Sequence, residues 1–224
     1  MMWRSAIAAC LVATAAPASE CRLALLLAID ISQSVSVSEY ALQREGTAAA
    51  FEDPEIRATL LSGRPVAIAA FEWSGERETY LRVPWRLLES EADIDAVAAT
   101  IRGGARPFGG NTAAGRALET ARDYIDDAPA CDARTIDIST DGPNNAGPQP
   151  DTVTGAPGWG NVTVNALVIN GDDAPELVAR WLRGGIRGEH AFVEVAADFE
   201  DYARAFRRKL LREIEPPLML GRLE

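Results

Sequence analysis

Five oxygen-bearing side chains in this 224-residue sequence stand where they could together bind a metal ion. In chain order they are Asp30, Ser32, Ser34, Thr112 and Asp141. Carboxylate and hydroxyl oxygens are hard ligands, and the set contains no His or Cys. Such a set suits Mg²⁺ first, or Mn²⁺ or Ca²⁺, rather than zinc or copper.

The two aspartates mark the ends of strand-like segments. Asp30 follows the apolar run 23–29, and Asp141 follows the strand pattern 135–140. Thr112 ends the loop Gly-Gly-Asn-Thr, just before a helical pattern. Ligands of open α/β sheets bind outside the carboxyl ends of the strands. We therefore expect these side chains to meet at one edge of a sheet.

The elements that must position them alternate along the chain. Strands are predicted over 23–29, 66–71, 78–85, 135–140, 162–169 and 191–195. Helices are predicted over 38–53, 92–101, 113–126, 175–182 and 198–214. Residues 142–161 are rich in Gly, Pro and Asn, so we expect only a short or broken crossover helix there.

The N-terminus predicts a secretory signal peptide over residues 1–18. Arg4 precedes a small, apolar stretch, and Ala16-Pro17-Ala18 fits a cleavage site. The stretch is too short to cross a membrane, so the expected product is periplasmic or secreted and not an integral membrane protein. Lipid attachment at Cys10 is disfavoured, because only residues 5–9 would then form the apolar core of the leader.

Two cysteines remain beyond the leader, and in an exported chain they suggest one disulfide. Cys21 lies nine residues before Asp30, and Cys131 lies ten residues before Asp141. If the two strands are parallel neighbours with both aspartates at one end, both cysteines lie at the other end. We predict a disulfide between Cys21 and Cys131.

Composition sets broad limits on function. The formal net charge is −11, which argues against nucleic acid and anionic lipid as partners, since both need basic patches. Hydrophobic residues make up 47% of the chain, enough for one good core.

The motifs resemble those of the von Willebrand factor A domain, most closely an exported bacterial branch whose function is uncharacterised. Its metal-ion-dependent adhesion site has the form D-x-S-x-S, then a distant Thr, then the Asp of T-D-G. Asp30, Ser32 and Ser34 match the first part, Thr112 the second and Asp141 the third. The likeness covers roughly Cys21 to Ile214.

The resemblance fits a single α/β domain over 19–215, followed by a short tail, 216–224. We expect a doubly wound, Rossmann-like sheet of six mostly parallel strands in the order 3-2-1-4-5-6. The third strand is antiparallel at the edge, where Pro84 is tolerated, and helices cover both faces.

The resemblance implies a protein-binding module rather than an enzyme. With only two carboxylate ligands the metal keeps an open position, which an Asp or Glu of a protein partner can fill. We expect a monomer. The residues expected to surround the metal and contact the partner are Gln33, Phe108, Asn111, Asn144 and Asn145.

Two other functions stay open. A metal-assisted hydrolase would need a general base at the ion, such as Asp137 or Glu72. A metal-free scaffold would use the same Asp and Ser residues only as helix caps. We favour a structural role for Asp137, with Arg134 or a backbone amide as its partner, and a solvated helix end for 207–209.

Overall fold

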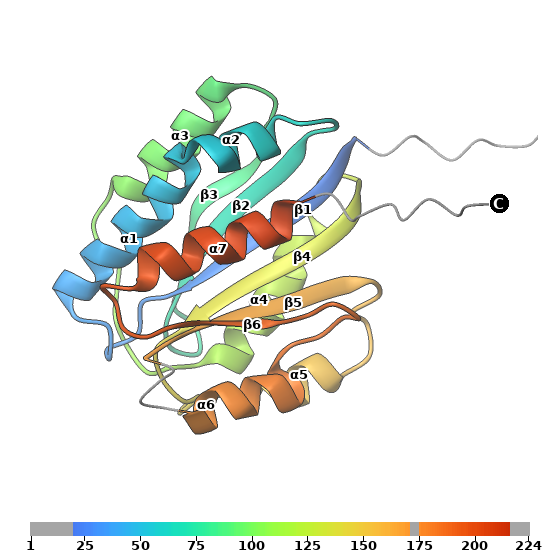
Figure 1. Ribbon diagram of the computed structural model, residues 1–224. Coiled ribbons are helices and arrows are strands. Elements are labelled where there is room, and N and C mark those ends of the chain that lie inside the picture. Colours follow the sequence, from blue (N-terminus) through green and yellow to red (C-terminus); the bar gives the residue numbers. More distant parts are fainter. Residues whose placement is uncertain (1–19, 171–174, 216–224) are drawn as a thin grey trace, which may run out of the picture.

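The structure, a computed structural model, describes residues 20–170 and 175–215 (Figure 1). Its six-stranded sheet has the order β3-β2-β1-β4-β5-β6, with only β3 antiparallel to its neighbour. The predicted sheet is confirmed. The strands are β1 (Cys21–Asp30), β2 (Val66–Trp73), β3 (Thr79–Leu88), β4 (Cys131–Thr140), β5 (Val162–Ile169) and β6 (Val193–Ala196).

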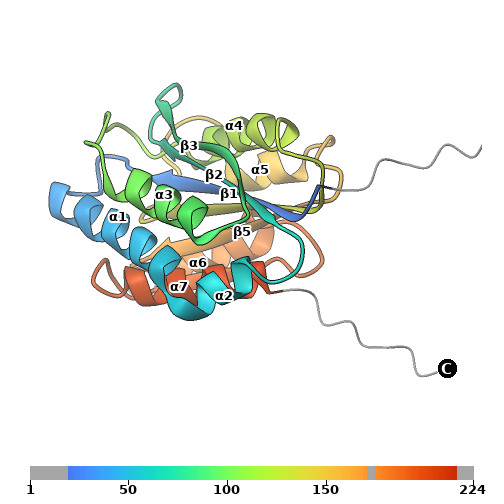
Figure 2. The same cartoon turned by 90° about the horizontal axis from the view of Figure 1, so that it is seen from above.

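Helices cover both faces of the sheet (Figure 2). On one face lie α1 (Val37–Glu52), α2 (Pro54–Leu60), α3 (Glu91–Arg102) and α7 (Tyr202–Ile214). The core of the other face is completed by α4 (Ala114–Asp126), α5 (Pro150–Gly155), α6 (Pro175–Arg180) and the π-helix η1 (Trp181–Gly185).

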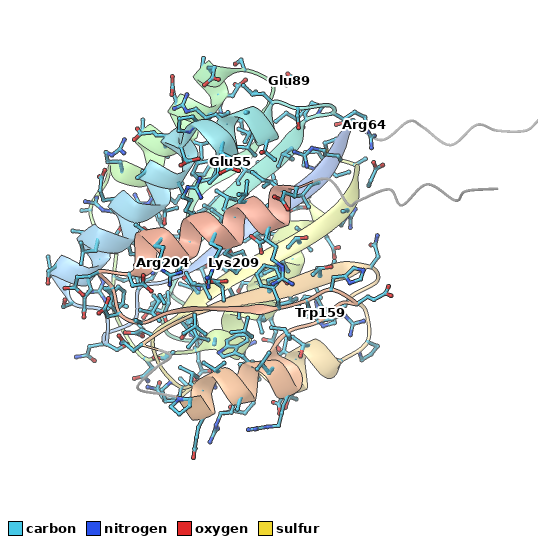
Figure 3. All side chains as sticks on the ribbon, in the orientation of Figure 1. Glu55, Arg64, Glu89, Trp159, Arg204 and Lys209 are labelled. Atoms are coloured by element: carbon cyan, nitrogen blue, oxygen red, sulfur yellow. A yellow bond between two sulfur atoms is a disulfide. The ribbon has the colours of Figure 1, made fainter. Side chains whose placement is uncertain are left out.

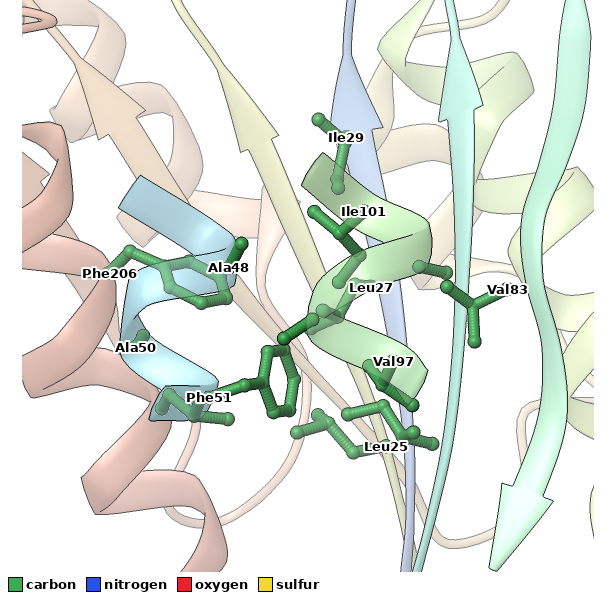
Figure 4. Packing of buried hydrophobic residues seen from close by; sticks show 14 of the residues in the cluster. Leu25, Leu27, Ile29, Ala48, Ala50, Phe51, Val83, Val97, Ile101 and Phe206 are labelled. Carbon is green, nitrogen blue, oxygen red and sulfur yellow. The ribbon is translucent and has the colours of Figure 1, made fainter. Parts of the chain in front are cut away.

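Side-chain alternation in β1 divides the apolar interior into these two cores. Leu25 and Leu27 point into the core under α1, α3 and α7, where they meet Phe51 and Phe206 (Figure 4). The even-numbered Leu26 joins the core under α4. A strand buried on both faces must be apolar throughout, which explains the continuous run 23–29.

The register between β1 and β4 places the carboxyl ends of these two strands side by side, as predicted. Leu23 pairs with Ala133 and Ala28 with Ile138, so Asp30 lies level with Thr140, just before Asp141. At the opposite end Cys21 pairs with Cys131, and their Cα atoms are 4.5 Å apart. The structure contains the predicted disulfide between them.

Several predicted boundaries move for local reasons. The predicted helix 38–53 ends before Pro54, and Pro54 begins a second helix, α2. The first amides of α2 donate hydrogen bonds to the Asp53 carboxylate. The predicted helix 198–214 starts at Tyr202, because Asp198 caps a turn before it. The short crossover helix expected within 142–161 is α5.

The partner of Asp137 differs from the one expected from the sequence. Lys209 of α7, labelled in Figure 3, is fully buried. Its Nζ lies 2.7 Å from Asp137 Oδ1 and 2.5 Å from Glu213 Oε1. Arg134 instead pairs with Asp126. The expectation that residues 207–209 are solvated is therefore wrong for Lys209, which faces the sheet. Arg207 is half-buried and Arg208 is exposed, and each forms an ion pair, Arg207 with Asp53 and Arg208 with Glu194.

The predicted leader, 1–18, and tail, 216–224, lie outside the described residues. Within 20–170 and 175–215, no helix has the length and apolarity needed to cross a bilayer.

Candidate metal centre

The centre is built around the end of β1, where Asp30 is fully buried. Its Oδ1 accepts a hydrogen bond from the Ser32 amide at 2.7 Å, and its Oδ2 accepts one from the Thr140 hydroxyl at 2.9 Å. The first bond turns the chain sharply out of the sheet. The second ties the end of β1 to the end of β4, as their register allows.

The remaining predicted ligands form a continuous chain of hydrogen bonds. Thr112 Oγ1 lies 3.2 Å from Ser32 Oγ, which lies 3.1 Å from Ser34 Oγ. The Ser34 hydroxyl in turn donates to Asp141 Oδ1 at 2.7 Å. Side chains from three separate loops therefore converge on one point, with Ser32 and Thr112 buried and Ser34 exposed.

Arg106 holds the loop that carries the serines, a role that the sequence did not suggest. Its guanidinium donates to the carbonyl of Val35 at 2.8 Å and to those of Ile31 and Ser32 at 2.5 and 2.6 Å. These carbonyls fold around one planar cation, which an Arg fork satisfies and a Lys cannot. An Arg in a loop has no distinguishing pattern of its own.

Asn145 fixes the position of Thr112, and Asn144 holds the start of the following helix. The Asn145 side chain accepts from the Thr112 amide at 2.9 Å, and the Asn145 amide donates to the Thr112 carbonyl at 2.9 Å. Asn144 accepts from the Gly115 amide at the start of α4. A Cβ on Gly115 would lie 1.9 Å from the Pro148 carbonyl oxygen, so only glycine lets this loop approach the helix.

The residues expected to contact a partner differ in their surroundings. Gln33 and Asn111 are exposed, so both side chains are accessible from the metal-site surface. Asn145 is exposed as well but also holds Thr112. Phe108 is half-buried and packs against the first core, which leaves only part of its ring for a partner.

The centre holds two carboxyl groups, Asp30 and Asp141, whose negative charge the surrounding residues do not fully balance. Burial raises the pKa of Asp30 to about 7, and the neighbouring Asp141 charge adds to the rise. Burial also raises the pKa of Asp141, while the Ser34 hydrogen bond and, more weakly, the Arg106 charge lower it. A cation bound between the two carboxylates would favour their charged forms.

The donor set fits a divalent ion with an open coordination position. Among the described residues, no three His, Cys, Asp or Glu side chains gather in a group that could hold a metal. The neutral hydroxyls of the cluster could supply further ligands, and such ligands would leave a bound ion its Lewis acidity. Asp30, Ser32, Ser34, Thr112 and Asp141 are the residues that would hold it.

Replacing Arg106 with Ala is expected to weaken Mg²⁺ binding about 10- to 100-fold, the usual effect of removing a group that orients the ligands. Isothermal titration calorimetry measures it. Arg106→Lys should recover only part of the affinity, because it keeps the charge but not the fork. Arg86→Ala, on the exposed part of β3, is the matched control. Equal affinities in all four proteins would contradict the positioning role.

Comparison with known families and structures places this geometry in context. The family described as "Protein of unknown function (DUF1194)" matches residues 20–218. No curated protein matches the chain.

Solved structures share the fold at low identity. Proximal thread matrix protein 1 from the mussel byssus, solved with a zinc-occupied MIDAS motif, is 15% identical with a TM-score of 0.60, over 87% of this chain and 46% of that one. A von Willebrand factor type A protein from Catenulispora acidiphila is 19% identical, with a TM-score of 0.55, over 87% and 43%.

The pilus adhesin SpaC from Lactobacillus rhamnosus GG is 11% identical, with a TM-score of 0.61, over 87% of this chain and 31% of that one. The chain thus spans less than half the length of these three proteins. At such identities the likeness shows the fold, which is that of the von Willebrand factor A domain.

Proposed function

Since this chain belongs to the DUF1194 family and has the von Willebrand factor A fold, we propose that it is a divalent-metal-dependent module that binds a protein partner. One observation carries the proposal. The hydroxyls of Thr112, Ser32 and Ser34 and the carboxylate of Asp141 form one chain of hydrogen bonds beside the buried Asp30.

Helix capping does not account for this arrangement. The structure gives Ser36, not Ser32 or Ser34, as the residue that caps α1, and α4 has no side-chain cap at all. The hydroxyls instead bond to one another and to a carboxylate across three loops. A cluster of this kind could coordinate a hard cation that prefers oxygen ligands, such as Mg²⁺.

The proposed partner supplies the missing ligand as an Asp or Glu side chain. Two carboxylates neutralise a divalent ion, so a third carboxylate is attracted mainly through direct coordination. The exposed side of the site, at Ser34 and the half-buried Asp141, gives a partner access. The net charge of −11 disfavours a partner that is acidic throughout, because like charges slow the encounter.

We also propose that the protein is exported. The disulfide between Cys21 and Cys131 persists in oxidising compartments, and the predicted leader would direct the chain there. Two proteins that share the fold are named for extracellular structures, the mussel byssus and the bacterial pilus, which fits an exported binding module.

The proposal is tested by capture from periplasmic extract on the immobilised protein, with Mg²⁺ or with chelator. Proteins retained only with Mg²⁺, and lost from Asp141→Asn, would support it. The exposed Asp123→Asn on α4 is the control. Retention that neither chelator nor Asp141→Asn alters would show that the metal centre does not bind the partner.

Metal binding should also stabilise the fold. A ligand that binds only the native state at 100 times its Kd adds about 2.7 kcal/mol, so saturating Mg²⁺ is expected to raise Tm by several degrees. Asp141→Asn should abolish the rise and Asp123→Asn should keep it. Differential scanning calorimetry with Mg²⁺, Mn²⁺ and Ca²⁺ measures the effect. No rise with any of the three would leave the centre without a metal.

A further inference from the structure

A pocket of about 280 Å³ opens directly beside the metal centre. Gly142, which follows the proposed ligand Asp141, and Asn144 form its near wall. Leu177 and Trp181, both buried, give it an apolar side. The pocket thus extends the surface of the metal centre towards α6 and η1, which lie beside α5 in Figure 1.

Two cations line the far wall of this pocket. Arg180 and Arg183 are exposed, and neither forms an ion pair within the described part of the chain. Many other arginines do: Arg57, Arg82, Arg102, Arg116, Arg204, Arg207 and Arg208 each contact a carboxylate. What distinguishes Arg180 and Arg183 is that both line the same pocket, in a chain whose net charge is −11.

The backbone that carries Arg183, directly after Arg180 at the end of α6, has an uncommon form. The five residues Trp181–Gly185 form a π-helix, a geometry that is rare and often found at functional sites. A Cβ on Gly185 would lie 2.3 Å from the Trp181 ring, so glycine is what lets the ring pack there.

The π-helix is fixed against its neighbours. The Thr154 hydroxyl of α5 donates to the Gly184 carbonyl, and Arg187 donates to the Thr154 carbonyl at 3.0 Å. The segment that carries Arg183 is therefore held in place beside α5, and the side chains of Arg180 and Arg183 are exposed.

We propose that this pocket binds a second acidic side chain of the partner segment whose first acidic side chain completes the metal. The inference rests on the proposed function and specifies the partner as a peptide segment with two acidic residues. Guanidinium groups bind carboxylates through paired hydrogen bonds, and the apolar side of the pocket strengthens them.

A carboxylate fits this pocket better than a phosphate. Asp151 also lines it, so the charged lining is two arginines against one aspartate. The resulting single net positive charge is balanced by one carboxylate, whereas a doubly charged phosphate would leave an excess negative charge beside Asp151.

The test uses the full chain and a library of synthetic octapeptides that carry one fixed Asp, with all other positions randomised. Peptides are selected with Mg²⁺ or with chelator. With Mg²⁺, selection should favour a second Asp or Glu at a defined spacing from the fixed Asp. In the double variant Arg180→Gln, Arg183→Gln this preference should fall about tenfold, the effect of losing one such contact. Arg86→Gln is the control.

The outcomes separate the two proposals. Mg²⁺-dependent binding through a single Asp, with no preference for a second acid, would overturn the pocket proposal and leave the metal proposal standing. A preference for two acids that survives in the double variant would place the second subsite elsewhere and also overturn it. Binding unaffected by chelator would refute both proposals.

Discussion

Replacing Cys21 and Cys131 together with alanine is expected to lower the free energy of unfolding by about 4 to 5 kcal/mol. The two cysteines are 110 residues apart in sequence, so their bond closes a large loop in the unfolded chain. Loop closure removes conformational entropy from that state, and the effect grows with loop length. The register of β1 and β4 already places the two Cα atoms 4.5 Å apart, so the native fold need not change.

Urea denaturation of the wild type and the variant measures the difference, and the reduced wild type is the matched control. It should fall to within about 1 kcal/mol of the double variant, because both lack the same cross-link. Equal stability of the oxidised and reduced wild type would show that the bond adds nothing.

Much of this fold follows from the pattern of apolar residues. A strand buried on both faces must be apolar throughout, and 23–29 and 66–71 have that composition. Pro84 could be placed at the edge because it cannot donate to a ladder, and it lies at the irregular pairing between β2 and β3.

The convergence of the five side chains that we propose as metal ligands was also predictable from the sequence. Each lies at a strand end or at a loop before a helix, where parallel topology brings distant residues together. The matched spacing from the cysteines to Asp30 and Asp141 predicted the register in which β1 pairs with β4.

Residues that act through the backbone were not accessible in this way. Arg106 was not singled out, and Asn145 was expected only to contact a partner. Both position the site by bonding to main-chain groups, and such contacts leave no periodic signal. Lys209 was missed because basic residues near the end of a helix usually lie in solvent. Its burial depends on the direction in which α7 faces the sheet.

Lys209 is therefore the residue at which a single change is expected to have the largest effect outside the disulfide. Lys209→Met keeps the length of the side chain but leaves Asp137 and Glu213 buried without a cation. Removing one partner of a buried ion pair costs about 3 to 5 kcal/mol. Arg204→Ala, an exposed pair on the same helix, should cost about 1 kcal/mol or less.

Urea denaturation at neutral pH measures these differences. Adding Asp137→Asn to Lys209→Met should recover part of the stability, since it replaces a buried carboxyl group that Lys209 no longer balances with a neutral amide. A double variant no more stable than Lys209→Met alone would mean that the loss comes from packing and not from charge.

The same cluster predicts how stability depends on pH. Burial, and then the Asp137 charge, raises the pKa of Glu213 to about 8, whereas an unfolded Glu titrates near 4.3. Between these values the folded protein binds more protons than the unfolded chain. The contribution of Glu213 is thus fully present below about pH 4.3 and is lost as pH rises through 8, by up to about 1.4 kcal/mol per pH unit.

Glu213→Gln should remove this dependence, because a neutral amide can still accept from Lys209 and Asn165, which bond Glu213 Oε1 in the native protein. Unfolding free energies from pH 5 to pH 9, with Mg²⁺ present throughout, measure it. The raised pKa of Asp30 is the same in the wild type and the variant, so it does not enter their difference. The variant should equal or exceed the wild type in stability at pH 9 and fall below it at pH 5. Parallel curves would show that Glu213 stays ionised in the core, with Lys209 balancing both carboxylates.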